Sequence, residues 1–395
     1  VTLSKETLRD WANRISQATH VHPHIREVEF QGKTIVVIDV AKSLLKPVPC
    51  KGRHYKRVGK SYRQMNDQDL TRAVLEKLGM TWDEVVEPRA SFNDLDPEQI
   101  RRFRVLCNQK GRRSIPDDED NTAVLKKLNL LKDGQLLRAA VLLFGSEPQE
   151  FYPQAKLKIG RFRSETLIVD DREISGNLFQ QVENAMGYFR EHLQTRFERH
   201  GEPAREVIWE YPLAALREAV INAVCHRDYL DFGQSQVRWF DEYVIVLNPG
   251  GLPASLRLEE LKHGHRSVPR NRKIAEMFFY AGLIEHWGSG TLTILRECKE
   301  ANLPEPEFEE KQGALWLTMR KGGLTDARLQ ALGLNKRQIA AVKWVIEKGS
   351  ISVAEFASLI KDVTDKTLQR DLTGLVENEI FFTIGEKKAR RYKLK

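Results

Sequence analysis

Hydrophobic side chains recur at helical spacing between residues 213 and 226. The apolar positions are Leu213, Leu216, Val220 and Ala223. This pattern predicts an amphipathic helix whose polar face carries Glu218 and Asn222, four residues apart. A carboxylate and a carboxamide at that spacing can share one magnesium-bound phosphate. Because any amphipathic helix carries such pairs, two solvated polar side chains are the simpler interpretation of this stretch alone.

Two further segments change that interpretation, because each contains a glycine turn. Residues 243–248, Tyr-Val-Ile-Val-Leu-Asn, predict a buried strand. The strand runs into Asn-Pro-Gly-Gly-Leu-Pro, where Gly250 and Gly251 allow another group to approach the backbone closely. A second loop, Trp-Gly-Ser-Gly-Thr at residues 287–291, precedes a helix expected over residues 292–301. The N-terminus of a helix offers amide donors and a favourable dipole to phosphate.

The order of these elements resembles the GHKL ATPases, the Bergerat-fold group that includes gyrase and the histidine kinases. The resemblance covers residues 205–320. It implies that Glu218 orients or deprotonates the attacking water and that Asn222 ligates magnesium. Asn248 stands where the family has the aspartate that reads adenine, so it keeps an acceptor but loses the charge. The further cofactor-binding residues that the resemblance implies are His226, Gly250, Gly251, Arg270, Asn271, Gly288, Ser289 and Gly290.

A narrower resemblance comes from the strings around these residues. Arg-Glu-Ala-Val-Ile-Asn-Ala-Val-Cys-His-Arg-Asp-Tyr at residues 217–229, with Asn-Pro-Gly-Gly-Leu-Pro, Arg-Asn and Trp-Gly-Ser-Gly-Thr behind it, looks like the prokaryotic RecG-like or Schlafen-like transcriptional regulators. This resemblance extends over residues 30–395. The sequence has no Walker A string, so a P-loop helicase is not expected. It also lacks the loop and lysine of a protein kinase and the phosphoacceptor helices of a histidine kinase.

The C-terminal region predicts a second module. Helices are expected over residues 335–347, from a capping box at residues 352–355, and over residues 364–378, with strands at 380–384 and 391–394. This order resembles a winged helix-turn-helix, whose third helix would enter the major groove of DNA. A winged helix used only for protein contacts is the alternative. The residues expected to contact DNA are Lys366, Thr367, Gln369, Arg370, Thr373, Lys387, Lys388, Arg390 and Arg391.

The N-terminal region predicts a strand over residues 34–40, a basic hairpin with aromatic residues over 52–63, and a helix over 67–78. Such a hairpin could contact phosphates and stack bases. The stretch resembles the second half of the Schlafen-type AlbA-like domain. The acidic first half linked to nuclease activity has no counterpart in this sequence, so no nuclease is predicted. Between the modules we expect strands over residues 137–144 and 155–163 and a long helix over 177–197.

The length of the chain indicates how many domains it can form, and its net charge indicates the kind of partner it binds. The chain has 395 residues and a formal net charge of +8, which allows several domains of about 100–200 residues each. The positive charge favours a polyanionic partner such as nucleic acid. The four cysteines form no Cys-x-x-Cys pair, which fits a reducing cytosol. No apolar run approaches the roughly 18 residues of a membrane span, and no signal peptide is visible.

Together these observations predict a cytoplasmic α+β multidomain protein. We expect a partial AlbA-like domain at residues 1–88, a connecting α/β region at 89–204, a Bergerat-type α/β sandwich at 205–325 and a winged helix-turn-helix at 330–395. The expected function is a DNA-binding transcriptional regulator that binds ATP with magnesium and hydrolyses it slowly. The alternative is a non-enzymatic regulator that only senses nucleotide or has a decayed pocket. The sequence leaves the signal, the DNA site and a homodimer open.

Overall fold

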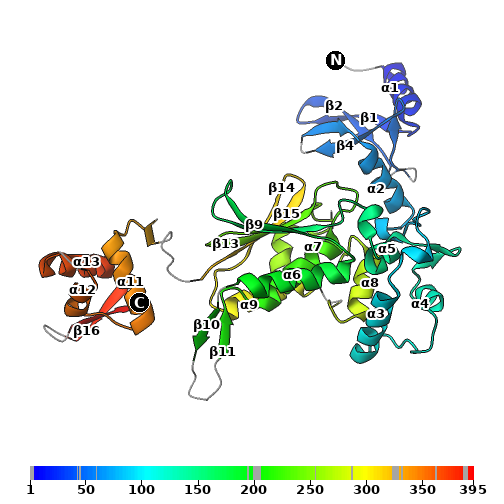
Figure 1. Ribbon diagram of the computed structural model, residues 1–395. Coiled ribbons are helices and arrows are strands. Elements are labelled where there is room, and N and C mark those ends of the chain that lie inside the picture. The colour runs from blue at the N-terminus through cyan, green and yellow to red at the C-terminus, as the bar shows by residue number, and fades with distance from the viewer. Residues whose placement is uncertain are drawn as a thin grey trace.

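The structure, a computed structural model, is a mixed α+β arrangement, as the sequence predicts (Figure 1). It describes residues 4–41, 43, 46–58, 60–193, 195–198, 206–253, 255–285, 288–322, 329–330, 332–360, 363–385 and 390–395. At its centre is a six-stranded sheet with the strand order β14-β15-β13-β12-β8-β9. The strands are β8 (Leu157–Phe162), β9 (Ile168–Ile174), β12 (Ser235–Trp239), β13 (Tyr243–Pro249), β14 (Glu307–Lys311) and β15 (Ala314–Arg320). The strands expected over residues 155–163 and 243–248 are confirmed as β8 and β13.

In this sheet β8 and β12 are parallel, with Leu157 paired to Ser235, and every other pair of neighbours is antiparallel. Parallel neighbours need a long connection, usually a helical one. Here the connection carries α6 (Leu178–His192) and α7 (Leu213–His226). These helices and α9 (Gly290–Glu300) lie together along one side of the sheet (Figure 1). The result is a two-layer sandwich that combines strands from residues 157–174 and 235–320.

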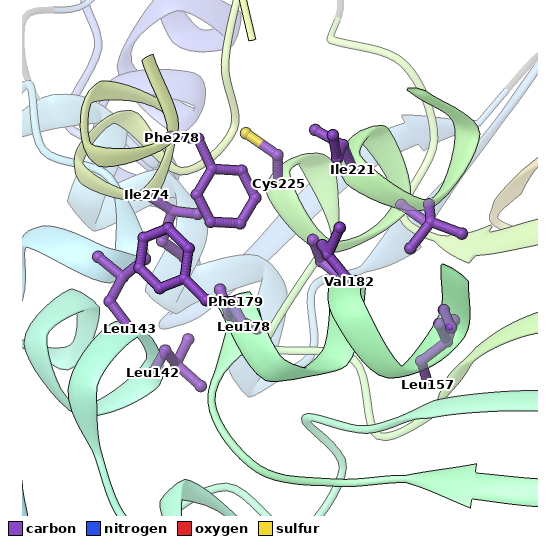
Figure 2. Packing of buried hydrophobic residues seen from close by; sticks show 14 of the residues in the cluster. Leu142, Leu143, Leu157, Leu178, Phe179, Val182, Ile221, Cys225, Ile274 and Phe278 are labelled. Carbon is purple, nitrogen blue, oxygen red and sulfur yellow. The ribbon is translucent and has the colours of Figure 1, made fainter. Parts of the chain in front are cut away.

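The main hydrophobic core forms where helices of this sandwich meet those of the connecting region (Figure 2). All apolar side chains of α5 (Arg138–Phe144) are buried there. Phe179 of α6 and Phe278 of α8 (Arg272–Tyr280) pack with ring centroids 5.3 Å apart. Ile221 and Cys225 of α7 lie beside them (Figure 2). Burial of apolar surface is the dominant favourable contribution to folding, so this core fixes α7 in place. The helices α3 (Pro97–Lys110) and α4 (Asn121–Lys127) extend the same core.

Two predictions for the connecting region are wrong. The strand expected over residues 137–144 is the helix α5, because a short continuous apolar run fits a buried helix as well as a buried strand. The helix expected over residues 177–197 ends at His192. The chain beyond it forms β10 (Thr195–Glu198), which pairs with β11 (Glu206–Trp209). Tertiary pairing therefore overrides the helical pattern at that point.

The N-terminal unit, residues 4–80, has no fully buried side chain among those that the structure describes. The strand, hairpin and helix expected here are confirmed as β2, β4 with β5, and α2. From this unit α2 leads toward α5 and α8 through η1 (Trp82–Glu84) (Figure 1). The elements of the unit are α1 (Lys5–Thr19), β1 (His24–Phe30), β2 (Lys33–Asp39), β3 (Pro49–Cys50), β4 (Arg53–Val58), β5 (Ser61–Gln64) and α2 (Asp67–Lys77).

The C-terminal unit, residues 329–395, has a hydrophobic core of its own that includes Val342, Phe356, Leu372 and Tyr392. Its three helices and its β-ribbon follow the predicted order. They are α11 (Lys336–Lys348), α12 (Val353–Leu359), α13 (Asp365–Glu377), β16 (Phe381–Ile384) and β17 (Arg391–Leu394). Short elements elsewhere are η2 (Phe92–Asp94), β6 (Leu131–Lys132), β7 (Gln135–Leu136), η3 (Pro148–Glu150) and η4 (Leu258–Lys262).

Candidate functional site

A cavity of about 310 Å³ opens between α7, the end of β13 and the loop that precedes α9. Ten of the side chains or glycines that the sequence analysis selects line this cavity. They are Glu218, Asn222, His226, Asn248, Gly250, Gly251, Arg270, Gly288, Ser289 and Gly290. The structure therefore brings together residues from three segments that are far apart in the sequence.

The cavity side of α7 is its one polar edge. Glu218, Asn222 and His226 follow each other at intervals of four residues and all line the cavity. Most other side chains of α7 are buried against the sheet and neighbouring helices. The polar pair therefore faces an enclosed space rather than open solvent, which differs from the solvated face of an ordinary amphipathic helix. Asn222 Nδ2 donates a hydrogen bond of 3.1 Å to Glu218 Oε1, which leaves the amide oxygen of Asn222 for another partner.

Burial sets the charge state of this edge. Desolvation raises the pKa of Glu218, although the hydrogen bond from Asn222 opposes the shift. Desolvation, with Arg270 and His265 nearby, lowers the pKa of His226 from 6.5 to about 4. His226 is therefore neutral near pH 7, because its charged form is disfavoured. Arg270 remains a cation, and it donates a hydrogen bond of 2.5 Å to the carbonyl oxygen of Gly251.

The glycines of the cavity stand close to neighbouring groups, and a Cβ atom on Gly288 would collide with the backbone oxygen of His265. A Cβ atom on Gly290 would collide with Glu218 Oε1, and one on Gly251 would collide with Glu310. Gly250 and Gly288 have φ angles of 98° and 66°, in the left-handed region that glycine adopts most readily. These positions form a cradle in which the backbone itself comes close to the cavity. Such a cradle suits a ligand that needs contacts with backbone amides.

The start of α9 adds amide donors to this cradle. The helix begins at Gly290, and its N-cap residue Ser289 makes no side-chain capping bond. The first amide groups of a helix have no partner within the helix, and they carry the positive end of its dipole. Trp287, which was grouped with this loop in the sequence, lies outside the described residues.

Asn248 and Asn271 have different positions. Asn248 lines the cavity at the end of β13, and its Oδ1 accepts a hydrogen bond of 2.8 Å from Ser235 Oγ. Asn271 does not line the cavity. It is fully buried behind the wall, where Nδ2 donates to the carbonyl oxygens of Cys225 at 2.9 Å and Arg227 at 2.8 Å. Its geometry is that of a side chain that holds the end of α7 against the start of α8.

Two residues of the site were not selected from the sequence. Ser235 orients the Asn248 carboxamide by a hydrogen bond. Asp228 lies in the loop after α7, and its Oδ2 is 3.5 Å from Arg270 Nη1. The signal for Asp228 was available in the His-Arg-Asp-Tyr string that follows α7. Nothing in the local sequence marks Ser235, because its partner lies on the neighbouring strand.

No group of three or more His, Cys, Asp or Glu side chains in the described part of the chain is placed to hold a metal ion. A magnesium ion in the cavity would therefore rest on Asn222 and on oxygens of its ligand. Magnesium in nucleotide sites commonly has few protein ligands and several from phosphates and water, so this donor set fits.

The residues selected for DNA contact occupy one helix and the ribbon. Lys366, Gln369, Arg370 and Thr373 are exposed on α13, and Thr367 is half-buried. Leu368, Leu372 and Leu375 of the same helix are fully buried.

The ribbon differs from α13 in what its basic residues contact. Arg390 is exposed, and Lys387 and Lys388 lie outside the described residues. Arg391 is already engaged, because its Nη2 is 2.9 Å from Glu355 Oε2 and its Nε donates to Ser350 Oγ at 2.8 Å. A phosphate would have to compete with Glu355 for Arg391.

Comparison with known proteins first concerns the fold. A crystal structure of the DIP2311 protein from Corynebacterium diphtheriae is similar to this chain with a TM-score of 0.51 and 18% identity, over 98% of this chain and 79% of that one. Identity this low indicates a shared fold alone. A search of curated proteins finds no match.

The family comparison is more specific. Residues 233–319 match the family described as putative ATP-dependent DNA helicase recG C-terminal, which supports a RecG-like, ATPase-type family. This segment includes Asn248, Arg270 and both glycine turns, whereas α7 precedes it. Residues 62–158 match a domain of unknown function. No described helix is both long and apolar enough to cross a membrane.

Proposed function

We propose that the chain is a DNA-binding regulator whose cavity binds ATP with magnesium. The observation that carries this proposal is the convergence of Glu218 and Asn222 from α7 with Gly290 at the start of α9. A carboxylate, a carboxamide and helix-start amides around one space suit a polyphosphate bound through a cation. The match of residues 233–319 to an ATPase-type family supports the same conclusion.

Each polar side chain of the cavity has a role in this proposal. Asn222 would hold magnesium through Oδ1, because its Nδ2 bonds to Glu218. Bound magnesium would supply charge neutralisation at the phosphates. Glu218 would accept the proton of an attacking water, and the burial that raises its pKa brings it closer to the range of an effective base near neutral pH. Arg270 would supply a positive charge to the phosphates, whereas His226 is neutral.

The opposite side of the cavity suits a flat base. Asn248 presents a carboxamide whose orientation is fixed by Ser235, so it can hydrogen-bond to a base edge. Apolar side chains provide the surface against which the face of a ring would pack. They are Val246, Leu252, Leu256, Leu261, Leu315 and Leu317.

The DNA-binding part of the proposal rests on the C-terminal unit and on the basic hairpin β4–β5. A helix with exposed Lys366, Gln369 and Arg370 and a buried apolar face has the form of a recognition helix in a winged helix-turn-helix. The hairpin adds Tyr55 and Tyr62, which are exposed and pack edge to face at 5.9 Å. Exposed aromatic rings among basic side chains favour single-stranded nucleic acid.

Calorimetric titration tests the cavity directly. Asn222→Ala should abolish magnesium-dependent ATP binding, because it removes the metal ligand and leaves the fold intact. The loss of stability should stay within about 1 kcal/mol, since no apolar contact of the core is removed. Asn93→Ala, at an exposed position of η2, is the matched control and should bind as the wild type does. Unchanged affinity in Asn222→Ala would sink the assignment.

Turnover tests the catalytic part of the proposal separately. Glu218→Gln should retain ATP binding but lose phosphate release by at least about 100-fold, the usual scale for removal of a general base. If the wild type binds ATP but releases no phosphate above a blank, with or without DNA, the chain is a nucleotide sensor rather than an ATPase.

A further inference from the structure

A line of alternating cations and carboxylates runs from the basic hairpin to the cavity. Lys56 Nζ on β4 lies 2.7 Å from Asp69 Oδ1, and Arg72 Nη1 on α2 lies 3.5 Å from the same oxygen. Arg72 Nη2 then reaches Asp228 Oδ2 at 2.5 Å, and Arg270 Nη1 lies 3.5 Å from that oxygen. Arg270 is part of the cavity wall. The N-terminal unit is thus linked to the cavity through Arg72.

The two carboxylates of this line are much less exposed to solvent than two of the cations that contact them. The side chains of Asp69 and Asp228 are only 11% and 9% exposed, whereas those of Lys56 and Arg72 are 43% and 38% exposed. A poorly hydrated carboxylate needs a cationic or hydrogen-bonding partner. Each of these carboxylates shares one oxygen between two cations, so the two cations compete for it. Burial opposes the shift, but hydrogen bonds from Lys56 and the Asn66 backbone, with the charges of Lys56 and Arg72, lower the pKa of Asp69.

Close to this line of charged side chains, η1 is bonded to the start of α8. Asp83 Oδ2 in η1 accepts a hydrogen bond of 2.9 Å from the amide of Ile274 in the first turn of α8. Glu84 Oε2 lies 2.8 Å from Arg272 Nη2 at the start of the same helix. The element η1, which follows α2, is therefore attached to the start of α8 at Arg272 and Ile274, two and four residues beyond Arg270. A change in the position of Arg270 can reach α2 without a change of fold.

We propose that Arg72 couples the cavity to the basic hairpin, so that an anionic ligand at Arg270 and a polyanion at Lys56 weaken each other's binding. This inference rests on the proposed function, because it takes the cavity as a nucleotide site and the hairpin as a nucleic-acid contact. Arg72 is a positioning residue in this scheme. It touches neither ligand and acts through Asp228 on one side and Asp69 on the other.

The sign of the coupling follows from the shared oxygens. A phosphate that draws Arg270 away leaves Asp228 with Arg72 as its ion-pair partner, so Arg72, which lies 2.5 Å from Asp228 Oδ2 and 3.5 Å from Asp69 Oδ1, is held at Asp228 and lost to Asp69. Asp69 then holds Lys56 alone and more tightly, and Lys56 is less available to a polyanion. A polyanion that binds Lys56 leaves Asp69 with Arg72 as its ion-pair partner. Asp228 then holds Arg270 more tightly, and Arg270 is less available to a phosphate. The reciprocity of linked binding requires the two effects to be equal.

The expected size is modest because Lys56 and Arg72 are partly exposed. Ion pairs of this kind are weak and are screened by salt, so we expect a coupling of about two- to fivefold in affinity at low ionic strength. A double-mutant cycle would give the coupling of Arg72 and Arg270 independently.

The experiment measures the dissociation constant of a non-hydrolysable ATP analogue with magnesium, with and without saturating single-stranded oligothymidylate. In the wild type the oligonucleotide should raise this constant about two- to fivefold. In Arg72→Ala the nucleotide should bind with the same constant whether or not the oligonucleotide is present, and Arg72→Lys should restore part of the effect. Arg26→Ala is the matched control, because it removes an exposed arginine of the same unit whose ion pair among the described residues is with the exposed Asp39.

The outcomes separate this inference from the function on which it rests. A rise that persists in Arg72→Ala shows that coupling runs through another part of the chain, such as α13, and overturns the proposal. Binding of both ligands to the wild type without any coupling overturns it as well, while the proposed function stands. Absence of nucleotide binding to the wild type overturns the proposed function and this inference together.

Discussion

His226 and Asp83 are ionisable side chains whose pKa values move in opposite directions. Desolvation, with Arg270 and His265 nearby, lowers the pKa of His226 from 6.5 to about 4. Burial raises the pKa of Asp83 from 3.8 to about 6, although hydrogen bonds from Thr81 and from backbone amides oppose the shift. Between about pH 4 and 6, the unfolded chain binds one proton more than the folded chain at His226 and one fewer at Asp83. The two contributions to stability therefore have opposite slopes and largely cancel in the wild type.

Replacing His226 with glutamine should reveal one of these slopes. As the pH falls from 6.5 toward about 4, the contribution of His226 to the stability of the wild type decreases, because only the unfolded histidine takes up a proton. The variant lacks this loss, so its stability relative to the wild type should rise by about 1.4 kcal/mol per pH unit across that window. Urea unfolding at a series of pH values measures the difference, with the exposed His22→Gln as control. A pH-independent difference would show that His226 is not desolvated in the folded chain.

At the scale of elements, α7 shows what the sequence can predict about the site. Its helical period and the spacing of Glu218 and Asn222 can be read from the sequence, and the structure places both residues on the cavity. The enclosure of that face cannot be read, because the segments that cover it, such as the loop before α9, are distant in the sequence. Periodicity also fails for α5, since its short apolar run carries no period that separates helix from strand.

The start of α8 shows why other parts could not be predicted. Its amide at Ile274 is capped by Asp83, which lies 191 residues earlier in the chain. Asn271 was expected in the cavity from the family resemblance, but its side chain turns inward to the end of α7. Adjacent residues of an irregular segment can point in opposite directions, and the sequence does not fix which one faces a ligand.

A prediction about DNA recognition belongs to α13. Arg370 is exposed on this helix and can donate two hydrogen bonds to guanine, so Arg370→Ala should relax sequence preference and cost about 1–3 kcal/mol at a preferred site. Lys336→Ala removes an exposed charge from α11 of the same unit, and it should weaken binding to all duplexes alike. Fluorescence anisotropy with preferred and scrambled duplexes makes the comparison. Equal losses on both duplexes in Arg370→Ala would mean that Arg370 neutralises phosphate rather than reads bases. Unchanged affinity in both variants would point to a protein-contact role for α13.

The whole molecule is built from parts with unequal cores. The central sandwich and the connecting region share one large hydrophobic core, and the C-terminal unit has a separate one. The described residues of the N-terminal unit include no fully buried side chain, and Arg72 of this unit pairs with Asp228 in the loop after α7. Parts that share no core can unfold at different free energies.

Two thermal transitions should therefore be separable in the intact chain. Leu372→Ala should lower the free energy of unfolding of the C-terminal unit by about 2–5 kcal/mol, and so lower the temperature of its transition. Ile221→Ala should do the same for the central sandwich by a similar amount. Each variant should leave the other transition in place, because the two side chains belong to different cores. Scanning calorimetry distinguishes the transitions. A single transition that both variants shift together would mean that the cores unfold as one.

The parallel pairing of β8 with β12 affects how the chain emerges during synthesis. Leu157 pairs with Ser235, so the sheet closes only after the long stretch between them has folded. Such non-local pairing slows folding. In the interval, β8 and β9 form a hairpin that lacks the strand which later covers β8, and Ile168 and Val169 of β9 are exposed even in the finished structure. Unpaired strand edges with apolar side chains recruit other chains. Aggregation of nascent chains, rather than instability of the finished protein, is therefore what we expect to limit its yield.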